Sequence, residues 1–559
     1  MKIGDIYDRI ESGPLEPVWI SLVPREVSLA RAAEVDGPLA GLTFAIKDNI
    51  DLAGLPTTAG CPAYAYRPER SATVVERLIN AGAIPIGKTN LDQFATGLVG
   101  TRSPYGACSS VFDPRYISGG SSAGSAVAVA RGLVDFSLGT DTAGSGRVPA
   151  AFNNLVGLKP TRGLLSTRGV VPACRTLDCV SIFANTAEAA RFVFRLARGF
   201  DAGDPFSRTI TAGQDAAPWI GGAFRFGVPA KEQLEFFGDD EAEGLYRKAL
   251  ADLEKSGGEK VEIDYSIFRA AAALLYSGPW VAERLAAIRE FMEVHADEMN
   301  PVVREIILGA RQYSAVDAFE ADYELRELRR ACEAEWAQID VMVLPTTGTI
   351  YTHEEVTAEP VKLNTNLGYY TNFVNLLDLA AVAAPAGFRT NGLPFGISFI
   401  GQAFSDEALL ALADFYQRAE VVKSDPPGCV SLAVVGAHLS GQPLNRQLSE
   451  RGARLIKTCR TAPGYRLYAL DGTVPAKPGL VRDAEFAGEG IEVEVWAVPE
   501  DRFGGFVAGV PAPLGIGSAT LDGGEVVKCF ICEGYAIGQA TEITEFGGWR
   551  AYLGRTDAG

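Results

Sequence analysis

The chain has 559 residues, of which 47% are hydrophobic and 21% charged, and its formal net charge at pH 7 is −18. Such a composition is typical of globular proteins, and the length exceeds that of one ordinary domain. The acidity makes nucleic acid an unsuitable partner, because polyanions are recognised by basic patches and the sequence has none.

The N-terminal residues and the cysteines argue against membranes and metals. Residues 1–8 carry charges where a signal peptide needs an apolar core, and no run of about 18 uncharged apolar residues follows. We therefore expect no membrane association. Nine cysteines, an odd and low number, favour reduced thiols in a cytoplasmic location. Cys529 and Cys532 form a CxxC pair, but a strand is predicted there and no second pair follows. We expect no metal and no other cofactor.

A predicted buried strand near the start of the chain carries a lysine. After an irregular arm with short helices over residues 1–38, residues 42–50 are predicted to form a strand with Lys47 among apolar neighbours. An ordinary lysine has a pKa of about 10.4 and is protonated at neutral pH, whereas burial lowers this pKa. Lys47 is therefore a candidate base. A salt bridge between Lys47 and Asp48 is the alternative interpretation.

The next segment contains a phosphate-binding pattern in an unsuitable context. Residues 82–89 match G-x-x-x-x-G-K-[ST], which functions as an open loop between a strand and a following helix. Here an amphipathic helix is predicted first, over residues 72–81, and the variable positions fall in a strand over 83–87. We therefore do not expect nucleotide binding.

Residues 118–163 contain the densest functional pattern. Two loops of small residues, 119–124 and 139–146, flank the apolar segment 126–138, which predicts a buried helix followed by a short strand. Glycines let backbones approach closely, and the loops offer serine hydroxyls and free N–H groups. Acyl transfer requires both. A Gly/Ser-rich linker is the alternative, but the intervening segment is too apolar for one.

Residues 120–124 also match G-x-S-x-G, the nucleophile elbow of α/β-hydrolases. That elbow needs a strand running into the serine and a downstream histidine. Residues 112–116 do not form a convincing strand. The only histidines are His295, His353 and His438, and none lies in an evident catalytic loop of this region. A Ser–Lys arrangement therefore fits the sequence better than Ser–His–Asp.

The remaining elements of the first part alternate between helix and strand. They are a helix at 187–196, a strand at 226–229, a largely helical stretch at 240–340, a strand at 341–346, a helix at 372–379 and a turn into a strand at 392–400. This alternation predicts an α/β fold with one large mixed sheet covered by helices. We assign residues 1–421 to this catalytic domain.

The composition changes at residues 422–428, where proline and glycine predict a linker. The following region is rich in strands and turns. Strands are expected over residues 430–436, 465–470, 492–498, 515–519 and 526–533. We therefore expect a smaller β-rich α+β domain over residues 429–559.

The serine loops, together with residues 45–49, resemble the amidase signature family over roughly residues 39–413. The resemblance implies the mixed-sheet fold of that family. It also implies a catalytic triad in which Lys47 is the base, Ser121 the bridging serine in a cis peptide, and Ser145 the nucleophile.

The same resemblance implies supporting roles within the serine loops. The backbone N–H groups of Thr142, Ala143 and Gly144 are expected to form the oxyanion hole. A pair between Asp141 and Arg147 is expected to hold this loop.

Within the family the sequence is most similar to the allophanate hydrolases. Gln93 stands where the tRNA-amidotransferase members of the family usually carry glutamate, and Ala143 and Gly146 depart from the general pattern. Residues 276–284 resemble the segment that holds the substrate carboxylate in allophanate hydrolases.

That resemblance implies that Tyr276, Arg284 and Gly97 bind the substrate. A guanidinium such as that of Arg284 can hold a carboxylate through two parallel hydrogen bonds. The alternative is a surface Arg284 paired with Glu283 or Glu290.

The resemblance implies hydrolysis of the terminal amide of allophanate, a small-molecule substrate, in urea degradation. The small domain is then expected to convert the product, N-carboxycarbamate, to ammonia and carbon dioxide. His438, which we expect to titrate near neutrality and to donate a proton, is the candidate catalytic residue of this domain. A homodimer and cooperation with a urea carboxylase are also expected. A general amidase acting on neutral amides, and a non-catalytic binding protein with the same fold, remain the alternatives.

Overall fold

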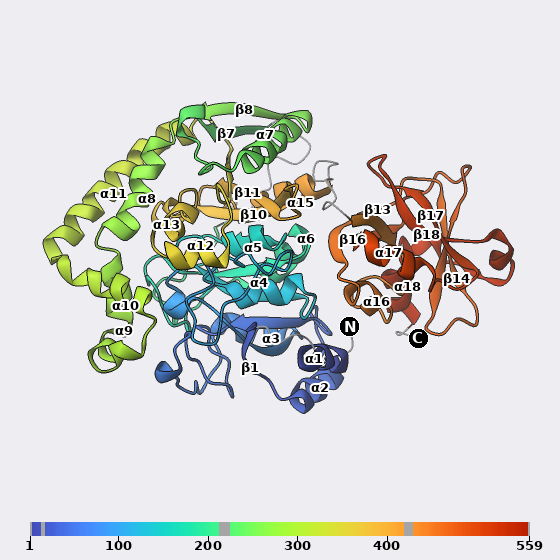
Figure 1. Ribbon diagram of the computed structural model, residues 1–559, viewed down its shortest axis with the longest axis horizontal. Helices are drawn as coiled ribbons and strands as arrows, with labels where there is room; N and C mark the ends of the chain where they lie inside the picture. Colours follow the sequence, from blue (N-terminus) through green and yellow to red (C-terminus); the bar gives the residue numbers. More distant parts are fainter. Residues whose placement is uncertain (1–2, 13–16, 212–223, 419–428, 557–559) are drawn as a thin grey trace. The chain divides into compact units, whose positions relative to one another are not determined.

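The computed structural model describes residues 3–12, 17–211, 224–418 and 429–556. The chain divides into two compact units, Ile6–Gln417 and a smaller one formed by Arg418–Gly559 together with Met1–Asp5 (Figure 1). The predicted linker, residues 422–428, lies outside the described residues.

The larger unit contains one sheet with these strands: β1 (Trp19–Leu22), β2 (Thr43–Lys47), β3 (Ile84–Thr89), β4 (Phe136–Asp141), β5 (Val156–Lys159), β6 (Cys179–Ala184), β7 (Phe224–Pro229), β8 (Gly258–Ile263), β9 (Val341–Pro345), β10 (Ala380–Phe388) and β11 (Pro394–Gly401). Their order in the sheet is β1-β3-β2-β4-β6-β5-β10-β11-β9-β7-β8. Strand β2 is parallel to β3 and β4, whereas β6, β5, β10 and β11 continue the sheet antiparallel. The predicted mixed sheet is confirmed.

The helices of this unit are α1 (Ile3–Ser12), α2 (Arg25–Glu34), α3 (Thr73–Asn80), α4 (Ala123–Ala130), α5 (Val148–Phe152), α6 (Ala187–Ala197), α7 (Asp240–Lys255), α8 (Ser266–Ser277), α9 (Val281–His295), α10 (Pro301–Leu308), α11 (Ala315–Trp336), α12 (His353–Ala358), α13 (Lys362–Leu367), α14 (Phe373–Leu376) and α15 (Asp406–Arg418). Helix α4 is buried over residues 123–129, and its small residues let it pack closely against strands β2, β3, β4 and β6. Helices α8 to α11 form an arm that the sequence inserts between β8 and β9 (Figure 1).

Five strands of this sheet, β1, β5, β6, β8 and β10, were not predicted. Residues 372–379 were expected to form one helix, but only Phe373–Leu376 are helical and β10 begins at Ala380. Alanine and proline are poor strand formers, yet β10 is buried along its whole length. Strand β1 lies in the supposed arm. Strand β8 is mostly exposed and polar, so it lacks the apolar pattern of a buried strand.

The smaller unit contains two sheets. Its strands are β12 (Cys429–Val434), β13 (Arg454–Arg460), β14 (Tyr465–Leu470), β15 (Lys477–Arg482), β16 (Glu492–Pro499), β17 (Leu514–Thr520), β18 (Val526–Cys532) and β19 (Thr541–Glu542), and its helices are α16 (Arg446–Ser449), α17 (Glu500–Val507) and α18 (Trp549–Thr556). The sheets have the orders β13-β16-β12-β18-β17 and β15-β14-β19. The five expected strands are present. Strands β13, β15 and β19 were not predicted.

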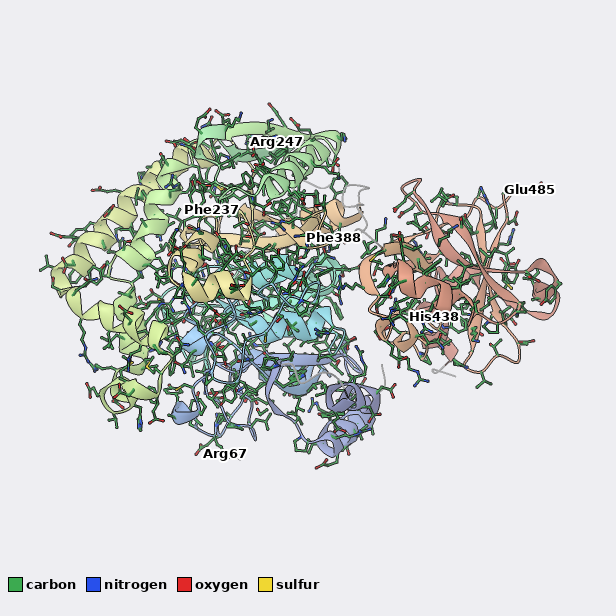
Figure 2. All side chains as sticks on the ribbon, in the orientation of Figure 1. Arg67, Phe237, Arg247, Phe388, His438 and Glu485 are labelled. Carbon is green, nitrogen blue, oxygen red and sulfur yellow. The ribbon has the colours of Figure 1, made fainter. Side chains whose placement is uncertain are left out.

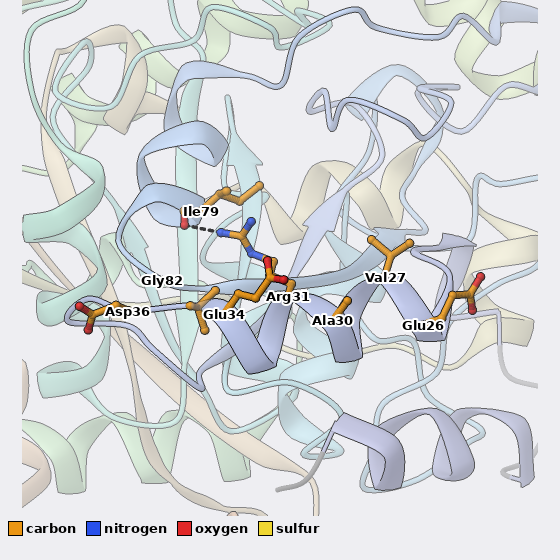
Figure 3. Close-up of a pocket in the computed structure, with 9 residues that line it drawn as sticks. Glu26, Val27, Ala30, Arg31, Glu34, Asp36, Ile79 and Gly82 are labelled. Atoms are coloured by element: carbon orange, nitrogen blue, oxygen red, sulfur yellow. Dashed lines mark hydrogen bonds between the residues drawn. The ribbon is translucent and has the colours of Figure 1, made fainter. Parts of the chain in front are cut away.

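Helix α2 packs beside the turn that joins α3 to β3. A groove of about 690 Å³ runs along it, lined by charged and apolar side chains (Figure 3). Arg31 in this groove donates hydrogen bonds to the carbonyl oxygens of Ile79 and Ala83. The arginine therefore attaches α2 to the sheet. Among the described helices, none is long and apolar enough to cross a membrane.

The lysine of the phosphate-binding pattern is part of the core. Lys88 Nζ lies 3.0 Å from Asp48 Oδ1, and both side chains are 0% exposed. Thr58 donates to the same carboxylate through its backbone N–H at 2.9 Å and its hydroxyl at 2.5 Å. Lys88 therefore lies within a strand as one partner of a buried ion pair. This excludes the P-loop interpretation.

We predict that Asp48→Ala lowers the free energy of unfolding by about 3–5 kcal/mol, because it leaves the Lys88 ammonium buried without a counter-charge. Urea denaturation followed by tryptophan fluorescence measures this loss. Asp8→Ala is the matched control, since the Asp8 side chain is 63% exposed in its pair with Arg25 and its loss should have little effect. Equal effects of the two substitutions would contradict the importance of burial.

Candidate active site

The two serine loops meet at one edge of the large sheet. Strands β2 and β4 are parallel neighbours, so the end of β2 at Lys47 and the loop after β4 lie at the same edge. Ser121 immediately precedes the helical region and follows Gly120 through a cis peptide bond. Ser122 accepts a hydrogen bond from Thr140 N at 3.3 Å and donates one to its carbonyl at 3.1 Å. These bonds join the two loops.

Lys47 is surrounded by hydroxyl groups. Its Nζ donates to Ser121 Oγ and Thr140 Oγ1, each at 2.7 Å, and its side chain is 0% exposed. Burial lowers the pKa of Lys47 to about 7, although three nearby aspartates oppose this shift. Lys88 is the partner of Asp48, so the alternative salt bridge between Lys47 and Asp48 is wrong. A substantial fraction of Lys47 is thus neutral at pH 7 and able to accept a proton from Ser121.

Ser145 lies in the loop after β4, at 3% exposure. Its hydroxyl donates to the carbonyl of Gly97 at 3.4 Å. In the described part of the chain, no hydrogen bond joins Ser145 to Ser121, so the expected relay requires a rotation of the Ser145 side chain. A Cβ atom at Gly97 would lie 2.5 Å from Asp92 Oδ2, which explains why glycine occupies this position.

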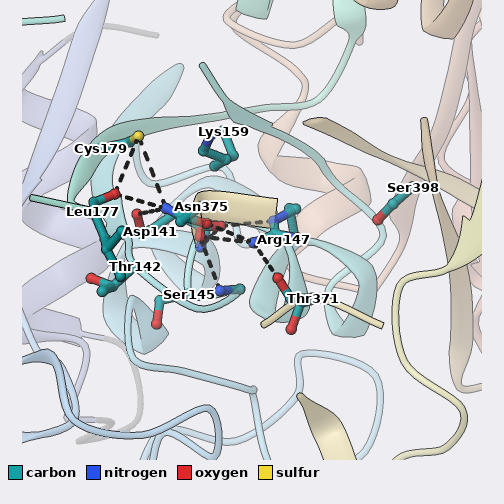
Figure 4. Close-up of polar contacts among 12 residues, drawn as sticks. Asp141, Thr142, Ser145, Arg147, Lys159, Leu177, Cys179, Thr371, Asn375 and Ser398 are labelled. Atoms are coloured by element: carbon teal, nitrogen blue, oxygen red, sulfur yellow. Dashed lines mark hydrogen bonds and ion pairs between the residues drawn. The ribbon is translucent and has the colours of Figure 1, made fainter. Parts of the chain in front are cut away.

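Asp141 organises the backbone of this loop (Figure 4). Its carboxylate accepts hydrogen bonds from Gly144 N at 2.9 Å, Gly146 N at 3.0 Å and Arg147 Nε at 2.9 Å. The expected pair of Asp141 and Arg147 is present, and both side chains are 0% exposed. Arg147 also donates to the carbonyl of Thr371 at 3.2 Å. The loop is therefore fixed from two sides.

The same carboxylate changes the expected oxyanion hole. The N–H of Gly144 donates to Asp141, so it is not available to a substrate in this conformation. Among the described residues, the N–H groups of Thr142, Ala143 and Ser145 have no hydrogen-bond partner. Ser145 itself therefore replaces Gly144 as a candidate oxyanion donor. The sequence could not indicate this exchange, because it depends on where one carboxylate points.

Arg284 is buried in α9, not exposed on the surface. Its guanidinium donates to Thr96 Oγ1 at 2.9 Å, the Ala95 carbonyl at 3.4 Å and the Tyr276 hydroxyl at 3.3 Å. Its Nε has no partner. In the described part of the chain it forms no ion pair, and Glu283 accepts hydrogen bonds from Thr176 instead. The alternative of a surface pair is wrong.

Residues 95–97 connect the guanidinium to the nucleophile loop. Arg284 contacts residues 95 and 96, and Ser145 contacts residue 97. A second buried arginine, Arg102, donates to the Thr96 carbonyl at 3.0 Å. Sequence reasoning missed Arg102, because it lies in no motif. The site thus combines a serine, a buried amine and a cluster of positive charge.

The histidines of the larger unit belong to other contacts. His353 lies 3.0 Å from the Ser109 hydroxyl, and His295 pairs with Glu298 near the surface. Residues 112–116 contain no strand, so the nucleophile-elbow interpretation is excluded. Within the described residues, no cluster of acidic, histidine and cysteine side chains could hold a metal ion.

His438 lies in the smaller unit (Figure 2). It lines a cavity of about 230 Å³. Its Nε2 lies 3.0 Å from Gln447 Oε1, its ring stacks on Phe530 with centroids 4.8 Å apart, and Lys477 lines the same cavity. Burial lowers the pKa of His438 to about 4, so the ring is neutral at pH 7. The expectation that this histidine titrates near neutrality is wrong, because its ring is enclosed by apolar neighbours.

The CxxC pair lies on β18 as expected. Cys529 is completely buried, and burial raises its pKa to about 12. A thiol with so high a pKa is protonated at neutral pH and is a poor nucleophile or metal ligand.

Among the described residues, the serine that lies in the first of the two loops contacts a buried lysine rather than a histidine. A family model described as Amidase matches residues 23–410, and one described as Allophanate hydrolase C-terminal domain matches residues 430–554. The chain therefore belongs to the amidase family, as its sequence motifs predict.

Named relatives support this assignment. Urea amidolyase of Lachancea kluyveri is 46% identical over 97% of this chain and 32% of the relative, and that of Saccharomyces cerevisiae is 45% identical over 99% and 32%. The chain thus spans about a third of these relatives. The structure of Kluyveromyces lactis allophanate hydrolase is 44% identical, with a TM-score of 0.71 over 99% of this chain and 96% of that one. The structure of a glutamyl-tRNA(Gln) amidotransferase component from Thermotoga maritima is 26% identical, with a TM-score of 0.65 over 76% and 94%.

We predict that a fluorophosphonate reagent labels Ser145 at a rate that falls about tenfold per pH unit below about pH 7, because protonated Lys47 cannot accept a proton. The rate is measured by stopping the labelling reaction at successive times and quantifying the labelled protein by mass spectrometry. Ser145→Ala should abolish labelling, and Ser122→Ala should retain it. Labelling that persists in Ser145→Ala, or a rate independent of pH, would assign the nucleophile or the base to other residues.

Proposed function

We propose that this chain hydrolyses the terminal amide of allophanate, a urea that bears a carboxylate on one nitrogen. The observation that carries the proposal is the buried Arg284, which has no carboxylate partner among the described residues and shares residues 95–97 with the nucleophile loop. A buried guanidinium that contacts no carboxylate is costly, and an anionic substrate would supply that contact. The 44% identity to Kluyveromyces lactis allophanate hydrolase supports the same substrate.

The proposed reaction begins with proton transfer from Ser145 through Ser121 to neutral Lys47. Ser145 Oγ attacks the terminal carbonyl carbon, and the negative charge that develops on the carbonyl oxygen is stabilised by backbone N–H groups of the loop. Each such donor typically contributes about 10²–10³ in rate. The relay then returns its proton to the leaving nitrogen, which departs as ammonia. Water, activated by the same relay, releases the acyl group as N-carboxycarbamate.

The substrate carboxylate is proposed to lie against Arg284 and Tyr276. The guanidinium has an unpartnered Nε, and the Tyr276 hydroxyl already lies 3.3 Å from one of its terminal nitrogens. The two groups can therefore bind one carboxylate together. Gly97 would line the space between this carboxylate and Ser145.

The smaller unit is proposed to act on N-carboxycarbamate. Loss of carbon dioxide from this dianion leaves an amide nitrogen that must gain a proton, and the resulting carbamate then gives ammonia and a second carbon dioxide. The His438 cavity offers Lys477 as a positive group and a neutral imidazole as a hydrogen-bond donor or acceptor. His438 would then act by orienting the substrate or passing on a proton, because its low pKa leaves almost no imidazolium at pH 7.

Other expectations remain proposals. The urea amidolyase relatives favour cooperation with a urea carboxylase activity, and self-association as a homodimer and a cytoplasmic location rest on the sequence alone. A general amidase acting on neutral amides is the rival function. If the protein were a general amidase, the burial of Arg284 would have no role in substrate binding.

We predict that Arg284→Leu raises the Michaelis constant for allophanate at least about tenfold, because a charge-assisted hydrogen bond to the substrate is lost. The Michaelis constant for propionamide should change much less. Arg289→Ala, an exposed arginine on the same helix, is the matched control. Ammonia release measures each constant, and equal increases for the charged and the neutral substrate would favour the general amidase.

We also predict that His438→Phe leaves the first ammonia unchanged and slows the second. In this variant the ring volume is retained while the polar nitrogens are lost. Rapid quench of a single turnover, with ¹³C NMR of the carboxylated products, separates the two steps. Release of both ammonia molecules at wild-type rates would show that the cavity does not act on the intermediate.

A further inference from the structure

Asp178 is a buried carboxylate that the reaction described above does not use. It ends the turn that precedes β6, and it is 7% exposed. Its Oδ1 accepts hydrogen bonds from the Thr142 hydroxyl at 2.5 Å and from Cys174 N at 3.1 Å, and its Oδ2 accepts one from Ala173 N at 2.8 Å. The carboxylate therefore joins the turn of residues 173–178 to the oxyanion loop.

The other side of this turn contacts the helix that carries Arg284. Cys174 Sγ donates to the carbonyl of Trp280 at 3.5 Å, one residue before α9 begins. Thr176 donates to Glu283 through its N–H at 2.9 Å and its hydroxyl at 2.5 Å. The turn therefore lies between the candidate oxyanion donors and the helix of the candidate carboxylate-binding residue.

From this geometry we propose that ionised Asp178 is a positioning residue, which fixes Thr142 so that the oxyanion donors keep their place relative to Arg284. The inference rests on the proposed function, because it concerns the same site. Three hydrogen bonds converge on one carboxylate, and each requires it as an acceptor. Once protonated, Asp178 is a weaker acceptor with one O–H of its own, so the bonds from the two N–H groups weaken and the bond with the Thr142 hydroxyl weakens or reverses its direction.

The charges around Asp178 make its protonation state responsive to mild acid. Burial raises its pKa to about 6, while its hydrogen bonds and Arg284 oppose the shift. Lys47 on β2 and the buried thiols of Cys174 and Cys179 are the other titratable groups within electrostatic reach. Asp178 is thus ionised at pH 7 and becomes protonated as the pH falls through about 6.

The first test removes the hydrogen bond from each side. Asp178→Asn and Thr142→Val should each lower kcat about 10- to 100-fold with little change in KM, because the oxyanion exists only in the transition state. The double variant should lose no more than the single variants, since they break the same contact. Thr142→Ser keeps the hydroxyl and should recover most of the rate. A wild-type kcat in Thr142→Val, or additive losses in the double variant, would overturn the proposal.

The second test is the pH profile, which a merely structural role would not alter in this way. Just below about pH 6 the wild-type kcat/KM should fall by clearly more than tenfold per pH unit, because protonation of Asp178 adds its own 10- to 100-fold loss to the loss of neutral Lys47. In Asp178→Asn the fall should be about tenfold per unit and begin at lower pH, since Asp178 raises the pKa of Lys47. Far-UV circular dichroism at each pH establishes that the variants stay folded. If kcat/KM fell with the same slope and over the same pH range in the two proteins, the proposal would be overturned.

Labelling of Ser145 by the fluorophosphonate separates this inference from the choice of substrate. The P=O oxygen of the reagent occupies the same oxyanion hole, so the labelling rate should show the same loss in Asp178→Asn and the same change of slope. If the wild-type protein did not hydrolyse allophanate but these labelling effects were observed, the proposed function would fail and the role of Asp178 would stand. If labelling were unaffected while allophanate hydrolysis proceeded, the role of Asp178 would fail alone.

Discussion

The proposed chemistry of this protein depends on one buried amine that no carboxylate of the described residues contacts directly. Lys47 and Lys88 lie on neighbouring strands of one sheet, and both are completely buried. Lys88 contacts a carboxylate and forms an ion pair, whereas Lys47 contacts two hydroxyls. Desolvation without a compensating charge lowers the pKa of Lys47 to about 7. Three features surround Lys47: the serine loops, the loop that Asp141 organises and the small residues of α4. Together they keep water and contacting anions away from the amine.

The sequence alone predicted the family and the mixed sheet, whereas the catalytic roles of the site residues stay predictions. Lys47, Ser121 and Ser145 lie in short motifs whose spacing carries the family resemblance, and the alternation of helices and strands predicted the mixed sheet. Arg284 could be assigned only through resemblance, since nothing local separates a buried arginine from a surface one. Its burial is now established by the structure, while its role in binding a carboxylate stays a prediction.

Other features could not be predicted, because they arise from contacts distant in sequence. The central strand at Ala380–Phe388 is stabilised by burial that overrides its weak intrinsic preference. The hydrogen bond that Gly144 N–H donates to Asp141 depends on a side-chain direction that no motif encodes. Asp178 lies in a turn without a recognised pattern, and its importance appears only when Thr142 is seen beside it. His438 was expected to titrate near neutrality, but its apolar neighbours come from separate parts of the smaller unit.

The helical arm formed by α8 to α11 has a consequence for how this fold can change. The candidate nucleophile, the candidate base and the loops that surround them come from residues 47–147, whereas Arg284 and Tyr276 come from a segment inserted between β8 and β9. Replacement of that segment could therefore alter which acyl groups are accepted without disturbing the bond-breaking apparatus. In this arrangement substrate choice and reactivity can evolve separately. The turn at residues 173–178 contacts both parts of the site, so a change in one part must remain compatible with the other part there.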